Sequence, residues 1–252
     1  DDPAVRAIGL HIEGLQDVAR FERAALKALS KGIPVVALKT GSSAIWSELT
    51  VSHTGSLSGA AELFEALFAR TGVISVTNPS QFLETLKFLC VAGAPKGTGV
   101  VGFTCSGGGA TMLADHAEKI GLGFPPVDPA QHTQIAALLP DIATVSNPLD
   151  YTTPIWGQGE QTYPVFAQTI AATAADTAVL VQDYPAPGLD ASKQYYQQDA
   201  AAFARAAKEH GVPAAVCATL PENMDVATRE LLVAEGIAPM QGIHEALNAI
   251  AQ

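Results

Sequence analysis

Short apolar runs alternate with segments of helical periodicity along this chain, and this alternation restricts the fold more than any other feature of the sequence. The run VRAIGLHIE (5–13) is typical of a buried strand, and LQDVARFERAALKAL (15–29) has apolar residues at helical spacing. The alternation continues with strands at 33–40 and 73–76 and with helices at 57–70 and 80–91. It predicts an α/β fold in which parallel sheets are covered by helices.

The pattern restarts after AGAPKGTG (92–99), a segment with the proline and glycine content of a linker. The second half predicts strands at 100–105, 177–184 and 213–220 and helices at 107–120, 191–209, 224–235 and 244–251. A chain of 252 residues with 48% hydrophobic content is large enough for two cores of medium size. We therefore expect two domains of the same class.

Charge and composition exclude several kinds of partner. A net charge of -11 and a pI near 4.8 would repel nucleic acid and anionic membranes, so we expect neither as a partner. The sequence shows neither a long apolar run typical of a membrane helix nor a signal-peptide pattern. Cys90, Cys105 and Cys217 are far apart in apolar runs, which favours buried free thiols over disulfides or a metal site. We expect a cytoplasmic protein that binds no metal through these residues.

Three segments place polar residues where strands end, which is where parallel sheets bind their ligands. Glu13 follows the first strand and has two interpretations, a solvated carboxylate that caps the next helix or a functional group. His53, in VSHTGSLSG (51–59), is either an ordinary surface residue or a reactive imidazole. In TCSGGGA (104–110), Ser106 can cap the following helix, and the glycines suit either tight packing or a phosphate cradle.

Several stretches together resemble a known family. IGLHIEGL, IPVVALKTG, SHTGSLSGAAELFEALFARTGVISV, TCSGGGATMLADHAEKIGL and SNPLDYT occur in the order found in NDP-forming acyl-CoA synthetases, which are relatives of succinyl-CoA synthetase. The resemblance extends over essentially the whole chain, and SHTGSLSG followed by ALFARTGVI is its most specific part. It implies two flavodoxin-like ligase domains, at 1–95 and 96–252.

The resemblance also implies roles for individual residues. The histidine matching His53 is phosphorylated in that family, the glutamate matching Glu13 holds its imidazole, and two helix N-termini face the phosphate. The phosphate-binding residues expected here are Gly55, Ser56, Ser106, Gly107, Gly108 and Gly109. Further candidates for the site are Thr40, Gly41, Asn147 and Asp150, although Asn147 and Asp150 lie in a turn that backbone geometry alone would explain.

The chemistry of these residues agrees with a phosphoryl relay. A neutral imidazole nitrogen is nucleophilic near neutral pH, and a carboxylate at Glu13 would fix the ring's tautomer and support its developing positive charge. Each helix N-terminus contributes about 0.3–2 kcal/mol toward an anion, depending on burial. Many relatives carry an arginine between the KTG and SHTG segments, whereas the corresponding loop here, SSAIWSELTV (42–51), contains no cation.

The function expected from the resemblance is the core of an acid–CoA ligase, which would form acyl-CoA from a carboxylic acid, CoA and ATP and release ADP and phosphate. ATP and CoA would be substrates, with Mg²⁺ accompanying the nucleotide in an ATP-grasp domain, and the chain itself would hold no cofactor tightly. The CoA-binding and ATP-grasp domains would belong to the same polypeptide or to a partner subunit, in an oligomer. The alternative is a non-catalytic scaffold of paired flavodoxin-like domains that binds an anion or a partner.

The aromatic and histidine residues are further candidates for a functional site. Tyr151, Trp156 and Tyr163 would line an acyl pocket or simply pack in the interior. The histidines other than His53 show no spacing typical of metal ligands, so we interpret them as ordinary residues. They are His11, His116, His132, His210 and His244.

Overall fold

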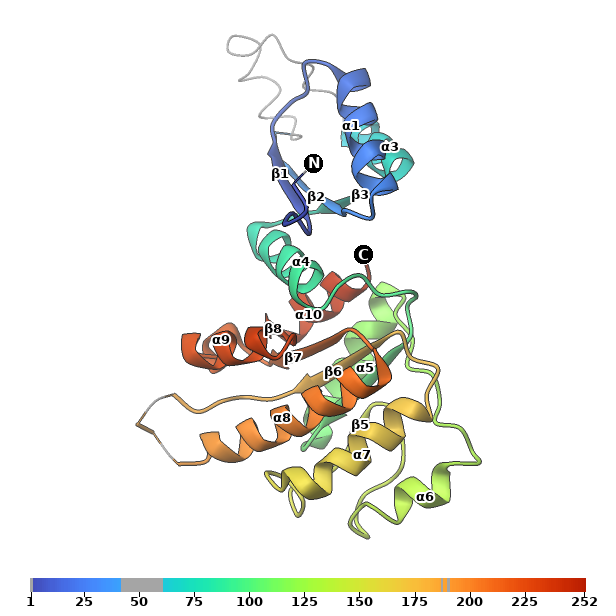
Figure 1. The fold of residues 1–252 in the computed structure, drawn as a ribbon, viewed down its shortest axis with the longest axis vertical. Coiled ribbons are helices and arrows are strands. Elements are labelled where there is room, and N and C mark those ends of the chain that lie inside the picture. The colour runs from blue at the N-terminus through green and yellow to red at the C-terminus, as the bar shows by residue number, and fades with distance from the viewer. Residues whose placement is uncertain (1, 42–60, 187, 190) are drawn as a thin grey trace. The chain divides into compact units, whose positions relative to one another are not determined.

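The computed structural model describes residues 2–41, 61–186, 188–189 and 191–252 (Figure 1). The chain forms two compact units, Asp1–Cys90 and Val91–Gln252. Within the described residues, no helix has the length and apolar content needed to cross a membrane. Each unit is an α/β structure built on a parallel sheet, as the alternating sequence pattern predicts.

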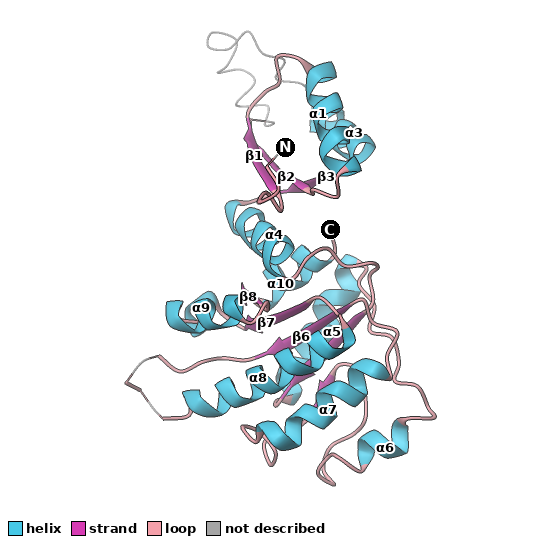
Figure 2. Cartoon of the chain, in the orientation of Figure 1, coloured by secondary structure: helices cyan, strands magenta, loops and turns pink. Residues whose placement is uncertain are grey.

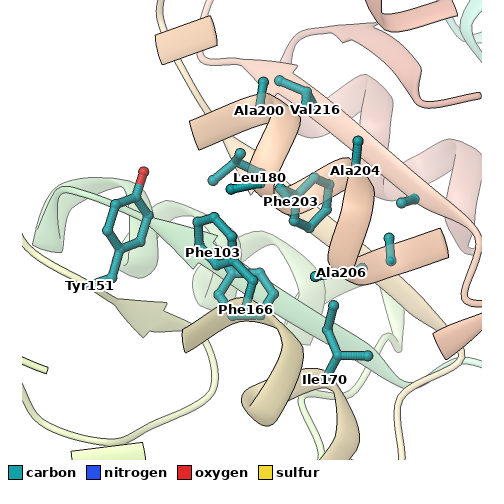
Figure 3. Packing of buried hydrophobic residues seen from close by; sticks show 14 of the residues in the cluster. Phe103, Tyr151, Phe166, Ile170, Leu180, Ala200, Phe203, Ala204, Ala206 and Val216 are labelled. Atoms are coloured by element: carbon teal, nitrogen blue, oxygen red, sulfur yellow. The ribbon is translucent and has the colours of Figure 1, made fainter. Parts of the chain in front are cut away.

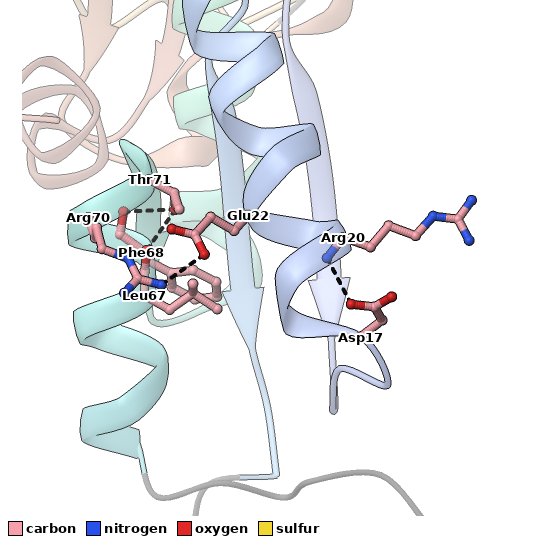
Figure 4. Close-up of polar contacts among 7 residues, drawn as sticks. All are labelled: Asp17, Arg20, Glu22, Leu67, Phe68, Arg70 and Thr71. Atoms are coloured by element: carbon pink, nitrogen blue, oxygen red, sulfur yellow. Dashed lines mark hydrogen bonds and ion pairs between the residues drawn. The ribbon is translucent and has the colours of Figure 1, made fainter.

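The first unit contains three parallel strands in the order β1-β2-β3 (Figure 2). Its elements are β1 (Ile8–Ile12), α1 (Val18–Ser30), β2 (Val35–Lys39), α3 (Ala61–Thr71), β3 (Val73–Val76) and α4 (Pro79–Val91). Helices α1 and α3 share a core with one face of the sheet, in which Ala37 and Phe64 are buried. An ion pair of 3.1 Å between Arg70 and Glu22 also joins these two helices (Figure 4).

Helix α1 begins and ends at residues whose chemistry explains its limits. The backbone N–H of Arg20 donates a hydrogen bond of 2.8 Å to Asp17 Oδ1, so Asp17 is the N-cap (Figure 4). After Lys31 the chain turns at Gly32, whose φ of 68° favours glycine. The predicted helix at 15–29 is confirmed, with its start moved to the residue that follows this cap.

The second unit contains five parallel strands in the order β5-β4-β6-β7-β8. Its strands are β4 (Val100–Thr104), β5 (Leu149–Asp150), β6 (Thr177–Val181), β7 (Ala214–Ala218) and β8 (Ala238–Gln241). Its helices are α5 (Gly107–Ile120), α6 (His132–Ala136), α7 (Gly159–Ala171), α8 (Lys193–His210), the short 3₁₀ helix η1 (Pro221–Asn223), α9 (Val226–Ala234) and α10 (Ile243–Ile250). Numbered within the unit, the strand order is 2-1-3-4-5, which is the flavodoxin-like order.

Aromatic side chains form the centre of the second core (Figure 3). Phe103 of β4 contacts Phe166 of α7 and Phe203 of α8, with ring centroids 4.9 and 6.0 Å away and edge-on geometry. All residues of β4, β6 and β7 are buried, because helices cover both faces of this sheet. This packing holds the ends of the central strands in fixed positions.

Five elements of the second unit were absent from the sequence-based prediction: the short helices α6 and η1, helix α7 and strands β5 and β8. Helix α7 includes Pro164, which removes a backbone donor and weakens a helical pattern, yet α7 packs closely against α8. Strand β5 has only two residues, within a segment expected to be a turn. Strand β8 includes Pro239, which a prediction from sequence treats as a strand breaker but which an edge strand tolerates.

Two histidines stack where α5 meets α10. The ring centroids of His116 and His244 lie 4.0 Å apart with planes 13° from parallel, and Asn248 Nδ2 lies 3.1 Å from His116 Nε2. Burial and the charges of His244 and Lys119 lower the pKa of His116, although Glu245 acts in the opposite direction. The fold therefore disfavours protonation of His116.

We predict that the free energy of unfolding decreases as the pH falls below the ordinary histidine pKa of about 6.5. In that range the unfolded chain binds a proton at His116 that the folded chain does not, and the loss is complete below the lowered pKa. Urea unfolding between pH 8 and pH 5 measures the effect. His116→Gln should reduce this pH dependence, whereas His132→Gln, at an exposed position, should leave it nearly unchanged.

Candidate functional site

The carboxyl edge of the first sheet brings together several candidate residues. Glu13 follows β1, and Thr40 and Gly41 follow β2. The Thr40 N–H donates to the carbonyl oxygen of Ile12 at 3.0 Å, so the two strand ends lie side by side. His11 Nε2 lies 3.0 Å from Thr40 Oγ1, which places an imidazole at the same edge.

Glu13 is an exposed residue and is not the cap of the helix that follows it. That position belongs to Asp17, which accepts the capping hydrogen bond from the Arg20 N–H. The interpretation of Glu13 as a helix cap is therefore wrong. Its carboxylate lies at the carboxyl edge, where its negative charge partly offsets the lowering of the Lys39 pKa by burial.

Lys39 is a residue of this edge that the sequence analysis did not select. Its Nζ donates a hydrogen bond to the carbonyl oxygen of Thr40 and lies 4.6 Å from the centre of the Phe64 ring. Burial lowers the pKa of Lys39, and the charge of Glu13 partly offsets that effect. The available signal was the alternation in VVALK, which puts this lysine on the helix-covered face with Val35 and Ala37.

His53, Gly55 and Ser56 lie outside the described residues, as do the first residues of the helix predicted at 57–70. The loop at 42–51, which lacks the arginine of many relatives, is outside them too. The structure describes the helix from Ala61 onward. The predicted contact between His53 and Glu13 thus stays a prediction.

The carboxyl end of β4 leads directly into α5 through TCSGGGA. Ser106 occupies the N-cap position with an extended backbone, but its side chain makes no capping hydrogen bond, which differs from the expected cap. Gly107 and Gly108 are exposed, whereas Gly109 is buried against Thr104. A Cβ atom on Gly109 would lie 2.6 Å from Thr104 Oγ1, so glycine is needed there for close packing.

Asp150 and Asn147 have different surroundings. Asp150 ends β5 beside Thr104, and its Oδ1 accepts a hydrogen bond of 2.9 Å from the Thr152 N–H. A Cβ atom on Gly107 would lie 3.6 Å from Asp150 Oδ2, which places this carboxylate next to the start of α5. Asn147 instead bonds three backbone groups, accepting from the Gly102 N–H and donating to two carbonyl oxygens. The Asn147 amide therefore fixes the position of the backbone around β4.

A buried carboxylate organises the segment that follows β5. Asp199 of α8 accepts hydrogen bonds from the Tyr151 hydroxyl at 2.9 Å, the Gly157 N–H at 3.0 Å and the Thr162 hydroxyl at 3.0 Å. Burial raises the pKa of Asp199, while these three donors lower it. Sequence reasoning missed Asp199 because it lies in a helix that reads as a polar surface helix.

The three aromatic candidates for an acyl pocket have packing roles. Tyr151 is fully buried in the core and bonds Asp199. Trp156 packs on Tyr195 and Tyr196, with ring centroids 5.4 and 4.8 Å away. The guanidinium carbon of Arg205 lies 3.6 Å from the centre of the Tyr163 ring. Each ring is thus used in contacts within the chain.

Asp183 follows β6 and is a second carboxylate that the sequence analysis missed. Its oxygens accept hydrogen bonds from the Thr219 N–H at 2.8 Å, the Thr219 hydroxyl at 2.7 Å and Asn223 Nδ2 at 2.8 Å. These bonds tie the ends of β6 and β7 together. Asp183 therefore stabilises the carboxyl edge next to the start of α5.

Thiols and metal ligands contribute little to this edge. The three cysteines are free, and burial, followed by the charge of Asp199, raises the pKa of Cys105 to about 11. A thiol with this pKa is almost entirely protonated at neutral pH and is a weak nucleophile. Among the described residues, no three histidine, cysteine or acidic side chains are grouped so that they would hold a metal ion.

Comparison with known proteins gives one family match and several relatives. Residues 1–89 match the family described as the succinyl-CoA ligase like flavodoxin domain. The alpha subunit of ADP-forming acetate–CoA ligase II from Pyrococcus furiosus is 36% identical over 58% of this chain and 31% of its own length. An ADP-forming acetate–CoA ligase from Methanocaldococcus jannaschii is 30% identical over 60% of this chain and 21% of its own length. The chain thus spans a third or less of these relatives.

Solved structures support the fold. A crystal structure from Pyrococcus horikoshii superposes with a TM-score of 0.77 and 22% identity, covering 98% of this chain and 51% of that one. An acetyl-coenzyme A synthetase from Candidatus Korarchaeum cryptofilum, solved with phosphate and ADP, gives a TM-score of 0.78 and 21% identity over 99% of this chain and 53% of its own. The expected flavodoxin-like class is confirmed.

We predict that Gly109→Ala lowers the free energy of unfolding by about 1–3 kcal/mol, the usual cost of overpacking a core. The new methyl group would overlap Thr104 Oγ1, and Thr104 is a buried, β-branched residue of β4 that has little room to move. Gly108→Ala is the matched control, because its methyl group would lie 3.7 Å from the nearest atom. Chemical denaturation that gives equal losses for both variants would contradict this account.

Proposed function

We propose that the chain is part of the core of an ADP-forming acid–CoA ligase, and the match of residues 1–89 to the succinyl-CoA ligase like flavodoxin domain is the premise of this proposal. The overall reaction would convert a carboxylic acid, CoA and ATP into acyl-CoA, ADP and phosphate. Relatives named as ADP-forming acetate–CoA ligases support this proposal. The second unit would be the second ligase domain, for which its strand order and the similarity of solved structures give support.

The proposed relay passes through His53. His53 would first take the terminal phosphoryl group of ATP on a ring nitrogen, with release of ADP, and would pass that group to the carboxylate of the acid to form an acyl phosphate. Attack of the CoA thiol on the acyl carbon would then give acyl-CoA and release phosphate. A neutral imidazole suits this role because it is nucleophilic near neutral pH and its phosphorylated form transfers readily.

The position of Glu13 is the observation that carries this proposal. Its carboxylate lies at the carboxyl edge of the first sheet, and Asp17 performs the capping that would otherwise explain it. A carboxylate in such a place can accept a hydrogen bond from an imidazole N–H, which sets the tautomer and stabilises the charged ring. We assign Glu13 to that role toward His53, with Thr40 and Gly41 forming the adjacent strand end.

The start of α5 would supply part of the phosphate site. The helix has 14 residues, and Ser106, Gly107 and Gly108 leave its first backbone N–H groups exposed. The Ser106 hydroxyl makes no capping bond and is therefore available to an anion. Asp150 lies beside Gly107, so its carboxylate would compete with phosphate for the same helix end.

Other parts of the enzyme would complete the reaction. We assign ATP and its Mg²⁺ to an ATP-grasp domain and CoA to a CoA-binding domain, either in the same polypeptide or in a partner subunit of an oligomer. The relatives are several times longer than the matched segment, which leaves room for both. The carboxylic acid and its acyl phosphate would meet this chain at the carboxyl edges.

We predict that His53→Ala abolishes both phosphoenzyme formation and ligation, whereas Glu13→Gln slows phosphorylation by about 10²–10⁴-fold without abolishing it. Glu13 would orient the ring without forming a covalent bond, so the slow reaction should persist. The measurement mixes the chain with its nucleotide-binding partner and labelled ATP and follows acid-labile, base-stable phosphate.

Glu118→Gln removes an exposed carboxylate of α5 in the other unit and serves as the matched control, with an expected normal rate. Full activity in His53→Ala would refute the relay. A normal rate in Glu13→Gln would remove Glu13 from it. If the wild-type chain takes up no phosphate, the alternative of a non-catalytic scaffold gains support.

A further inference from the structure

The ammonium group of Lys39 is held in place at the carboxyl edge of the first sheet. One of its three N–H donors bonds the Thr40 carbonyl oxygen, and the group lies 4.6 Å above the centre of the Phe64 ring. Lys39 ends β2, and Phe64 belongs to α3, so the contact joins two elements far apart in the sequence. A flexible lysine side chain becomes a cation at a defined position.

This placement has an energetic cost that the contacts offset. Partial burial disfavours an ammonium group and lowers the pKa of Lys39, while the negative charge of Glu13 raises it. The cation–π contact with Phe64 adds an attraction that offsets part of this cost. A lysine that served only to keep the protein soluble would extend into water and avoid this cost.

The location of this cation suggests what it binds. The chain carries a net charge of -11, so an anionic ligand needs a local positive charge to approach it. Lysine binds phosphate as a point charge, and this cation attracts a doubly charged phosphate more strongly than it attracts a singly charged carboxylate.

We propose that Lys39 binds the phosphoryl group at the carboxyl edge of the first sheet, with Phe64 holding its ammonium group in position. The proposal rests on the proposed ligase function for the identity of the phosphoryl group, and it names a cation that the 42–51 loop does not supply. The ligand chemistry is a phosphate dianion, either as free phosphate or as the phosphoryl group carried by His53.

Titration of the 252-residue chain with inorganic phosphate, followed by ³¹P NMR, tests the site without any need for the relay. We expect Lys39→Met to weaken phosphate binding by about tenfold or more, the usual effect of losing a hydrogen bond from a charged donor. Lys39→Arg should retain most of the affinity. Lys96→Met removes one charge from an exposed position in the second unit and should have little effect.

Two further readouts separate phosphate binding from a purely structural tether between β2 and α3. Phosphate affinity of the wild-type chain should decrease as the pH rises toward the Lys39 pKa, which lies below its usual 10.5, whereas Lys39→Arg should keep its affinity. Phe64→Leu preserves an apolar side chain but removes the ring, so it should weaken binding less than Lys39→Met does. Thermal melting of each variant confirms that it is folded.

The two sources of phosphate are distinguished by a second arm, in which phosphoenzyme formation is measured with the nucleotide-binding partner. A loss in the titration identifies a free-phosphate site, and a slower rate in Lys39→Met identifies contact with the phosphoryl group on His53. Equal behaviour of Lys39→Met and wild type in both arms would overturn the proposal. A wild-type chain that forms no phosphoenzyme refutes the relay alone, because the phosphate titration still decides the role of Lys39.

Discussion

Parallel strand pairing is the constraint on which the rest of this structure depends. Two consecutive strands that run in parallel need a connection that leads back from the carboxyl end of the first strand to the amino end of the second. Here helices make most of those connections. All strands of a sheet then end at one edge. Glu13, Lys39 and Thr40 are brought together by this rule in the first unit, and Ser106 and Asp150 in the second.

The loops at these edges need their own support, because they lie beyond the strand ladders. Carboxylates provide it in the second unit. Asp183 ties the ends of β6 and β7 through Thr219, and Asp199 fixes the segment from Tyr151 to Gly157 from inside the core. Removing a carboxylate from water, fully for Asp199 and partly for Asp183, is favourable only when donors surround it, so each network specifies one arrangement of its loop.

Local patterns made much of the fold predictable from the sequence. The alternation of apolar runs predicted β1, α1, β2 and β4 because burial on both faces of a sheet leaves a continuous apolar signal. Helix α7 was missed because Pro164 weakens the local helical signal, whereas contacts with α8 stabilise it in the fold. Strand β8 was missed because it is short and includes Pro239.

The candidate site was predictable to a smaller extent. Strand ends and glycines are visible in the sequence, so Glu13 and Ser106 could be selected as residues of the carboxyl edges. Lys39 could not, because its distinguishing contact is with Phe64, 25 positions later in the chain, and a lysine without that contact reads as a solvated charge. The role of Asp199 depends on tertiary contacts in the same way. His53 was selected by resemblance and stays a prediction.

The two outer strands of the second sheet affect how copies of this protein can associate. An open sheet edge offers unpaired backbone groups to a strand from another molecule. Here β5 has only two residues, and β8 contains Pro239, which has no backbone N–H to donate. Growth of the sheet into a continuous intermolecular one is therefore disfavoured at both sides. Assembly of this unit with other subunits would use helical and loop surfaces, which keeps it compatible with a closed complex and protects it from fibrous aggregation.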